Sequence, residues 1–339
     1  MTADADLAAL RSLWLDDSYP RILASRPSIA DDPFFSPSTI DGVLLRFLDA
    51  ERGLGPKRKS GAAVVQSAAQ RLEGTAAFRA EWDCVQFHRK GEARRLMMHA
   101  TNAGGTLYFG DAGLRASDGT LVLLGRSSLM LDADAPLRKR SDEMLAAQHL
   151  RAGFLVIERA AADLLERGAG CKGAYILDVG GYPTAEMAQF QGARYWDSDG
   201  VADEVTGKRG SELPCAGPAL PGHHELKQLA VLREAFRIAE RFFPETLGRL
   251  IFYRPNLTFR AIFAVFRMWV APVTRDRFKM VKQGEEAAAF FAPPEEGGLG
   301  LRPEDTPREL GGSGPSLDGD RFLLRACERY EATARLPKA

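Results

Sequence analysis

The stretch that decides the fold of this chain is residues 242–282, FFPETLGRLIFYRPNLTFRAIFAVFRMWVAPVTRDRFKMVK. Its pattern predicts the end of a helix, a short strand, a long apolar helix, a turn and a second strand. Within residues 257–270 the apolar side chains recur at steps of three and four, which places these on one face: Phe259, Ile262, Phe263, Phe266, Trp269 and Val270. Such a helix can belong to an ordinary core or form a movable wall over an apolar cavity.

The charged residues of this predicted helix are Arg260 and Arg267, which lie seven positions apart and therefore on one side. On an exposed helix face they are either solvated or available to anionic lipid headgroups, and both interpretations stay open. The helix is not a membrane span, because its apolar run falls short of the roughly 20 residues that a bilayer requires.

Outward from this stretch, the chain begins with helical patterns and then alternates strand and helix. Residues 1–95 predict a helical subdomain, interrupted by a loop at Pro20. Residues 96–315 predict an α/β domain, with a small mixed sheet flanked by helices and strands near 106–109, 120–124, 173–177, 250–253 and 278–281. Residues 189–224 lack periodicity and predict an irregular insertion, whereas residues 316–339 predict a helical tail.

Several motifs, taken in chain order, resemble the CRAL-TRIO family, the lipid-binding module of phosphatidylinositol transfer proteins and of tocopherol or retinal carriers. The motifs are Phe243-Pro244-Glu245-Thr246-Leu247-Gly248, Pro255, Pro272-Val273-Thr274, and the segments 44–51, 118–125, 174–181 and 306–312. The first three are similar to the family's aromatic-Pro-Glu turn, to the proline that ends a strand and to its Pro-Val-Thr motif. Segment 44–51 is similar to its N-terminal signature, segments 118–125 and 174–181 to two of its strands, and segment 306–312 to its closing motif. The resemblance spans about residues 41–312 and implies an apolar cavity closed by a gate helix at 257–270.

The resemblance also implies a ligand and a site. In phosphatidylinositol-binding members, the Glu of the turn, the Thr of Pro-Val-Thr and a Lys three residues later help to hold the headgroup. The matching residues here are Glu245, Thr274 and Arg277. These residues can instead form a structural ion pair that anchors the hinge of the gate, and the alternative stays open. The implied function is to bind a lipid and to transfer or present it between cytosolic membrane surfaces.

The chain departs from the family pattern in ways that leave the ligand open. Asp49 and Glu51 stand where the N-terminal signature has arginines, and a carboxylate there would repel a lipid phosphate. Tyr253 replaces the usual Asn before the proline. One alternative is a carrier of a smaller hydrophobic ligand, such as a retinoid, a tocopherol or a sterol-like compound. Another is a scaffold with a vestigial pocket, whose residues 189–224 bind a protein partner.

Composition narrows the class of partner. Lys and Arg number 45 and Asp and Glu number 45, so the net charge is zero. Broad nucleic-acid binding is not expected, because its affinity comes from a basic surplus. The N-terminus lacks the basic and apolar regions of a secretory signal, and the cysteines are widely spaced. We therefore expect a cytoplasmic protein that contacts membranes transiently and peripherally.

The sequence contains no recognisable catalytic or metal-binding motif. The histidines are scattered, at His88, His99, His149, His223 and His224. Neither a His-Glu-x-x-His motif nor a phosphate-binding P-loop is present, and no Gly-x-Gly-x-x-Gly turn follows a predicted strand. We therefore expect no enzyme activity, no metal and no cofactor other than a bound phospholipid or another hydrophobic ligand.

Overall fold

The computed structural model of the chain describes residues 3–53, 61–91, 106–129, 157–168, 170–180, 237–268, 270 and 272–314, with short pieces at 328–329, 331–332 and 334. The predicted insertion at 189–224, Trp269 and most of the predicted tail at 316–339 lie outside these residues. The side chains of Ile262 and Phe266 also lie outside the described part, although their backbone belongs to a helix.

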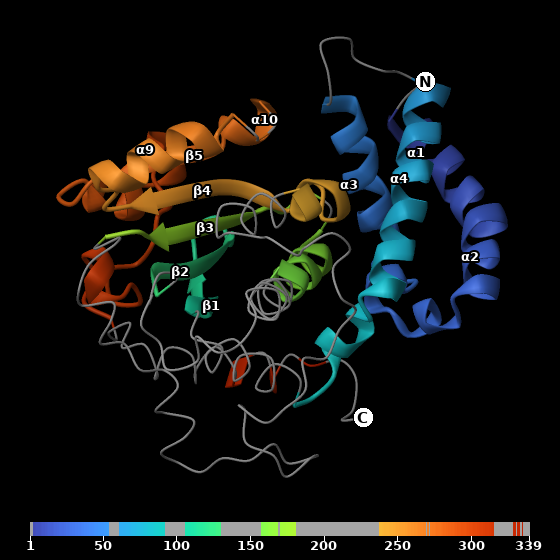
Figure 1. Ribbon diagram of the computed structural model, residues 1–339, viewed down its shortest axis with the longest axis horizontal. Coiled ribbons are helices and arrows are strands. Elements are labelled where there is room, and N and C mark those ends of the chain that lie inside the picture. Colours follow the sequence, from blue (N-terminus) through green and yellow to red (C-terminus); the bar gives the residue numbers. More distant parts are fainter. Residues whose placement is uncertain are drawn as a thin grey trace.

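The N-terminal part of the chain forms a helical lobe beside a sheet (Figure 1). Its elements are α1 (Ala3–Ser12), a π-helical turn (Leu13–Ser18), α2 (Tyr19–Ser25), α3 (Ile40–Gly53), α4 (Ala62–Glu81) and 3-10 turns at Pro27–Asp31, Pro33–Phe35 and Cys84–His88. The predicted loop at Pro20 is wrong, because Pro20 lies in the first turn of α2. Proline is tolerated there, since the first helical N–H groups have no partner within the helix. Apolar side chains such as Trp14, Phe47 and Leu72 give the lobe its own core.

The centre of the molecule is a five-stranded sheet in the order β1-β2-β3-β4-β5. The strands are β1 (Thr106–Arg115), β2 (Leu121–Leu129), β3 (Gly173–Asp178), β4 (Leu247–Tyr253) and β5 (Phe278–Val281). β1 runs antiparallel to β2, and the pairs from β2 to β5 are parallel. The predicted mixed sheet is confirmed, and every strand predicted from the sequence is present.

The two faces of the sheet carry separate apolar cores. Successive residues of a strand point to opposite faces, so Ile251 and Phe252 of β4 belong to different cores. The larger core includes Val122, Ile176, Ile251, Phe242 and Phe290, and the smaller one includes Leu177, Leu250, Phe252, Phe263 and Val270. Figure 1 shows α9 (Leu257–Phe266) lying along β4 and β5, on the side of the smaller core.

The helix predicted at 257–270 is shorter in the structure, where α9 ends at Phe266. Pro272 prevents a longer helix. It has no N–H to donate to the carbonyl of residue 268, its ring would clash with that carbonyl, and a proline disfavours helical geometry at the residue before it. The chain bends, forms the short α10 (Pro272–Arg275) and enters β5. Like the other described helices, α9 lacks the length and apolar character needed to cross a membrane.

Candidate functional site

Glu245 and Arg277, two of the residues predicted from the family resemblance, form an ion pair between β4 and β5. Arg277 Nη2 lies 2.9 Å from both carboxylate oxygens of Glu245, and Nη1 donates to the carbonyl of Leu247 at 2.6 Å. Both side chains are about four-fifths buried. The pair joins the segment that enters β4 to the segment that enters β5, so the structure contains the ion pair that the alternative interpretation expects.

Thr274, the third predicted residue, joins this group through its backbone. It lies in α10 and is buried, and its carbonyl accepts a hydrogen bond of 3.1 Å from the Arg277 N–H. The short helix thus places Thr274 and Arg277 three residues apart on the approach to β5. The Pro-Val-Thr motif therefore sets the position of the arginine as well as the end of the α9 segment.

Sequence reasoning missed two cations of this site, Lys172 and Arg46. Lys172 precedes β3 and forms an ion pair with Glu245. Arg46 projects from α3 in the helical lobe and donates to the carbonyls of Glu245 at 2.9 Å and Cys171 at 2.6 Å. Arg46 stands in the recognised N-terminal signature, but nothing in that motif indicates which strand it reaches. Lys172 lies in no motif, so only the pairing of β3 with β4 reveals it.

The electrostatics of the group favour an ionised Glu245. Burial alone would raise the pKa of this carboxyl group, but hydrogen bonds and charges from Lys172 and Arg277 outweigh it and hold the pKa below its ordinary value. Glu245 also has a left-handed backbone conformation, with φ of 55°. We call Glu245, Thr274, Arg277 and Lys172 the headgroup cluster from here on, after the role that the family resemblance implies for the first three.

A second ion pair lies at the opposite end of β4. Arg254 donates from Nε to Asp178 Oδ1 at 3.1 Å and from Nη2 to Asp178 Oδ2 at 2.6 Å. Asp178 ends β3, and its Oδ1 also accepts a hydrogen bond of 2.9 Å from the Gly180 N–H. Because Arg254 directly precedes Pro255 and α9, the segment between residues 254 and 277 begins and ends at an ion pair.

The inner face of α9 is aromatic and rests directly on the sheet. The Phe263 ring lies 4.8 Å from the Phe252 ring and 5.5 Å from the Phe278 ring, between centroids. Phe259 lies 5.1 Å from Phe252. Of the predicted face, Phe259, Phe263 and Val270 thus belong to the core on this side of the sheet. The rings fill the space between α9 and β4, and an apolar cavity and a movement of α9 remain predictions.

The outer face of α9 is exposed and carries both cations and large apolar side chains. Arg260 and Arg267 are both exposed. Leu257, at the start of the helix, is 82% exposed, and Met268, just after its end, is 65% exposed. Sequence reasoning missed Leu257 and Met268 because the pattern of the inner face assigned them no role.

Asp49 and Glu51, the two carboxylates that depart from the family's N-terminal signature, form ion pairs within the helical lobe. Glu51 is buried, accepts from Ser67 Oγ at 2.6 Å and lies 3.2 Å from Arg71 Nη1. Asp49 pairs with Arg52 on the same helix at 3.2 Å. These carboxylates therefore have cationic partners of their own, and the repulsion of a lipid phosphate expected from the sequence is reduced.

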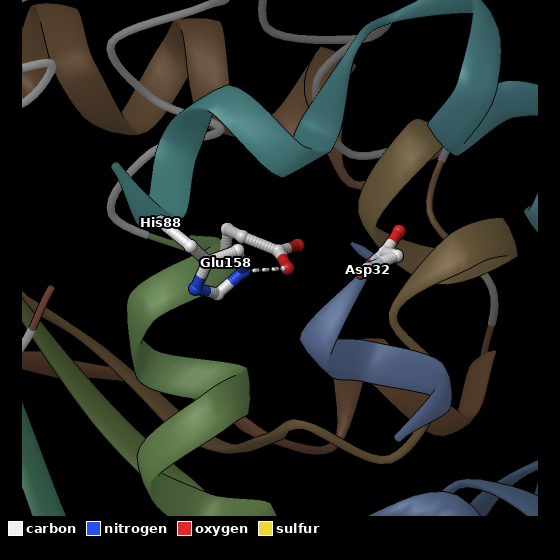
Figure 2. Close-up of side chains that lie close together, drawn as sticks. All are labelled: Asp32, His88 and Glu158. Atoms are coloured by element: carbon white, nitrogen blue, oxygen red, sulfur yellow. Dashed lines mark hydrogen bonds and ion pairs between the residues drawn. The ribbon is translucent and has the colours of Figure 1, made fainter. Parts of the chain in front are cut away.

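A buried charge cluster, also missed from the sequence, joins the helical lobe to the sheet domain. Asp32, His88 and Glu158 lie close together, and Figure 2 shows the contact of 2.8 Å between His88 Nε2 and Glu158 Oε1. Arg79, which is not drawn there, donates from Nε to Asp32 Oδ2 at 2.7 Å and from Nη1 to Glu158 Oε2 at 2.7 Å. The guanidinium thus satisfies both carboxylates. This donor set fits a structural ion network rather than a metal ion.

Comparison with known proteins identifies the domain. Residues 220–295 match the family model of the CRAL/TRIO domain. No curated protein matches the chain. Among solved structures, the crystal structure of Sfh5 is similar over 95% of this chain and 91% of that chain, with a TM-score of 0.50 and 12% sequence identity. At this identity the likeness supports the fold alone.

The match of residues 220–295 to the CRAL/TRIO model supports the family resemblance predicted from the motifs. Domains of this family bind lipophilic ligands and are not enzymes, which agrees with the absence of a catalytic motif from the sequence. The general function, binding of a lipid or another hydrophobic ligand, follows from the family.

Proposed function

We propose that the protein binds a lipid between the sheet and α9 and transfers or presents it between membrane surfaces in the cytoplasm, where it acts peripherally. The observation that carries this proposal is the two-sided character of α9. Its inner face presents Phe259 and Phe263 to the sheet, and its outer face exposes Leu257, Met268 and two arginines. A helix with this distribution suits an apolar ligand on one side and a membrane interface on the other.

The proposed mechanism is movement of α9 as a gate. The segment that contains α9 is held at one end by the Arg254 and Asp178 pair and at the other by the Arg277 and Glu245 pair. Between these anchors, the described side chains of α9 that contact the sheet include the phenyl rings of Phe259 and Phe263, which an acyl chain can replace with little loss of apolar contact. Each buried methylene of the ligand contributes about 0.8 kcal/mol to its binding.

For the headgroup we propose the cluster of Glu245, Thr274, Arg277 and Lys172. The supporting observation is the adjacency of Lys172 and Arg277 to one carboxylate, which leaves an excess of positive charge for a phosphate. The proposed division of the chain is a helical subdomain at 1–95, a lipid-binding domain at 96–315 and a tail at 316–339. We also propose that residues 189–224 contact a protein partner.

A second candidate is a carrier of one compact hydrophobic molecule, such as a retinoid, a tocopherol or a sterol-like compound. The close packing of the Phe252, Phe263 and Phe278 rings supports it, because a compact cluster of tilted and edge-to-face rings favours a rigid ligand over two diverging acyl chains. A scaffold with a vestigial pocket is the third candidate, and the same ring-filled contact supports it.

The test is native mass spectrometry of protein purified from a eukaryotic host, followed by extraction and identification of bound lipids. A co-purifying phospholipid supports the proposal. A single non-phospholipid species favours the compact ligand. Protein that is empty, and that also fails to load from mixed phospholipid vesicles, overturns the lipid carrier and favours the scaffold.

A further inference from the structure

Arg46 is a buried cation of the helical lobe that reaches the backbone of the sheet domain. It is 3% exposed, and its terminal nitrogens Nη1 and Nη2 donate to the carbonyls of Glu245 and Cys171 at 2.9 and 2.6 Å. The Cys171 carbonyl belongs to the segment that enters β3, and the Glu245 carbonyl to the segment that enters β4. One guanidinium therefore fixes these two segments relative to each other and to α3.

The two fixed segments carry two members of the headgroup cluster, Lys172 and Glu245. Lys172 follows Cys171 directly, and its ammonium pairs with the Glu245 carboxylate, which also accepts from Arg277. Glu245 has φ of 55°, a conformation that residues other than glycine keep only where the surroundings hold it. The hydrogen bond from Arg46 to the Glu245 carbonyl is one of the contacts that hold it.

The charge of Arg46 is poorly compensated. Within the described part of the structure it forms no ion pair, and its Nε is buried without a hydrogen-bond partner. That side chain borders a cavity of about 10 Å³, also lined by Phe47 and Thr246, which has room for about one water molecule. Burial lowers the pKa of Arg46 below its usual value. The stability of the fold alone does not account for a buried cation here, because burying an apolar side chain of similar size costs less free energy than burying a charge.

Together with its neighbours, Arg46 makes the site electropositive. Arg46, Lys172 and Arg277 each carry one positive charge and Glu245 carries one negative charge, so the group has a net charge of two positive. Arg46 fixes the segments of Lys172 and Glu245, and Glu245 in turn holds Arg277, so an anionic group that approaches Lys172 and Arg277 meets cations that are already in place. Preorganised cations of this kind bind phosphate more tightly than mobile ones, because less conformational entropy is lost on binding.

We infer that Arg46 is a positioning residue for the headgroup cluster, through which the helical lobe sets the preference of the site for an anionic, phosphate-bearing headgroup. The inference rests on the proposed lipid-binding function. Arg46 acts through the backbone at residues 171 and 245, and the contacts with the ligand belong to Lys172 and Arg277.

The test compares the loading of two labelled lipids from the same vesicles. Full-length protein is incubated with phosphatidylcholine vesicles that contain equal amounts of fluorescent phosphatidylinositol and fluorescent phosphatidylcholine, and the ratio of the two lipids in the protein is measured. The variants are Arg46→Met and Arg46→Lys. The matched control is Arg52→Met, which removes an arginine from the same helix that pairs with Asp6 and Asp49 instead of the cluster.

We expect wild-type protein to favour phosphatidylinositol, Arg46→Met to lower that preference about tenfold, and Arg52→Met to leave it unchanged. Arg46→Lys keeps the charge and can reach one carbonyl, so its preference should fall between those of wild type and Arg46→Met. Partial unfolding lowers the loading of both lipids together and leaves their ratio unchanged. The ratio of the two lipids therefore separates a positioning role of Arg46 from a merely structural one. If Arg46→Met folds too poorly to be measured, the ratio for Arg46→Lys gives the same test.

A double-mutant cycle with Glu245→Gln completes the test. If Arg46 acts through the cluster, Arg46→Met changes the lipid ratio much less in the Glu245→Gln background than in wild type. An unchanged ratio in folded Arg46 variants, equal loading of both lipids by wild type, or fully additive effects in the cycle would overturn the inference while leaving lipid binding intact. Wild-type protein that loads neither lipid would overturn the proposed function itself, and this inference with it.

Discussion

Glu245 and Arg254 lie on either side of β4, and both have a left-handed backbone conformation, with φ of 55° and 56°. Each is also held by an ion pair with a neighbouring segment, Glu245 by Arg277 and Arg254 by Asp178. A residue with a Cβ atom adopts this conformation at a cost of roughly 1–2 kcal/mol. The ion pairs offset that cost at the two ends of β4, and they also tie Arg254 and Arg277, the two ends of the α9 segment, to the sheet.

The backbone strain at Glu245 predicts an unusual order of stability. Glu245→Gly and Glu245→Ala both lose the ion pairs, but glycine adopts a positive φ freely. We expect the glycine variant to be more stable than the alanine variant by about 0.5–1 kcal/mol, measured by urea denaturation. At the exposed Glu304, which has no positive φ, alanine should be at least as stable as glycine. The same order at both positions would contradict strain at Glu245.

Reversing the charge of Glu245 should disable the headgroup cluster. Glu245→Lys places a third ammonium or guanidinium group beside Lys172 and Arg277, so we expect uptake of labelled phospholipid to fall at least tenfold. It should also lower the free energy of unfolding by about 2–3 kcal/mol, because a largely buried pair is broken. The control is Glu296→Lys, which reverses an exposed charge. Normal uptake by folded Glu245→Lys would remove Glu245 from the site.

The buried network around Arg79 predicts a dependence of stability on pH. Burial opposes ionisation of Glu158, but Arg79 and His88 outweigh it and lower the pKa of Glu158 to about 2. A carboxyl group with a lowered pKa stabilises the folded state fully above its unfolded pKa, about 4.3, and the contribution is lost as pH falls toward the folded pKa. We therefore expect the stability advantage of wild type over Glu158→Gln to be constant above about pH 5 and to shrink toward pH 2.

The measurement is the thermal midpoint of both proteins at a series of pH values. The control is Glu304→Gln at an exposed position, which should shift the midpoint by less than about 1 °C throughout. An advantage over Glu158→Gln that persists unchanged to pH 2 would show that Glu158 does not stabilise the fold through its charge.

The outer face of α9 predicts where the protein meets a membrane. Removing both cations with Arg260→Ala and Arg267→Ala should weaken binding to vesicles that contain phosphatidylserine, since each contributes about 1 kcal/mol near an anionic surface. Leu257→Asp should weaken binding to the same vesicles without loss of stability, because Leu257 is already exposed. Co-sedimentation with vesicles measures both effects.

The matched control for the apolar contact is Leu15→Asp, at an exposed leucine of the helical lobe. It should leave vesicle binding unchanged. If Leu15→Asp and Leu257→Asp reduce binding equally, the contact is not specific to α9. If neither α9 variant reduces binding, this face of the helix is not the membrane surface.

Much of the fold could be predicted because its signals are local. The run of apolar residues at 173–177, bounded by glycine and a charged turn, predicted β3, and the spacing of Phe259 and Phe263 predicted a helix with one apolar face. The end of α9 was harder to predict from the sequence, because it depends on the constraint that Pro272 places on the preceding turn. The helical conformation around Pro20 was missed because proline marks both loops and helix starts.

By itself, the sequence determined the α/β class and the position of each strand, because periodicity records local geometry. The resemblance of its short motifs to a known family pointed to Glu245 and Arg277 as members of one site. Only the tertiary structure decided that Arg46 and Lys172 join them, since 125 positions separate Arg46 from Cys171 and only the packing of α3 against the strand entries brings them together. It likewise decided that Arg79 joins Asp32 to Glu158, which lies 79 positions away. Long-range contacts between charges leave no periodic pattern in a chain, because their geometry is set by the packing of elements that fold from distant segments.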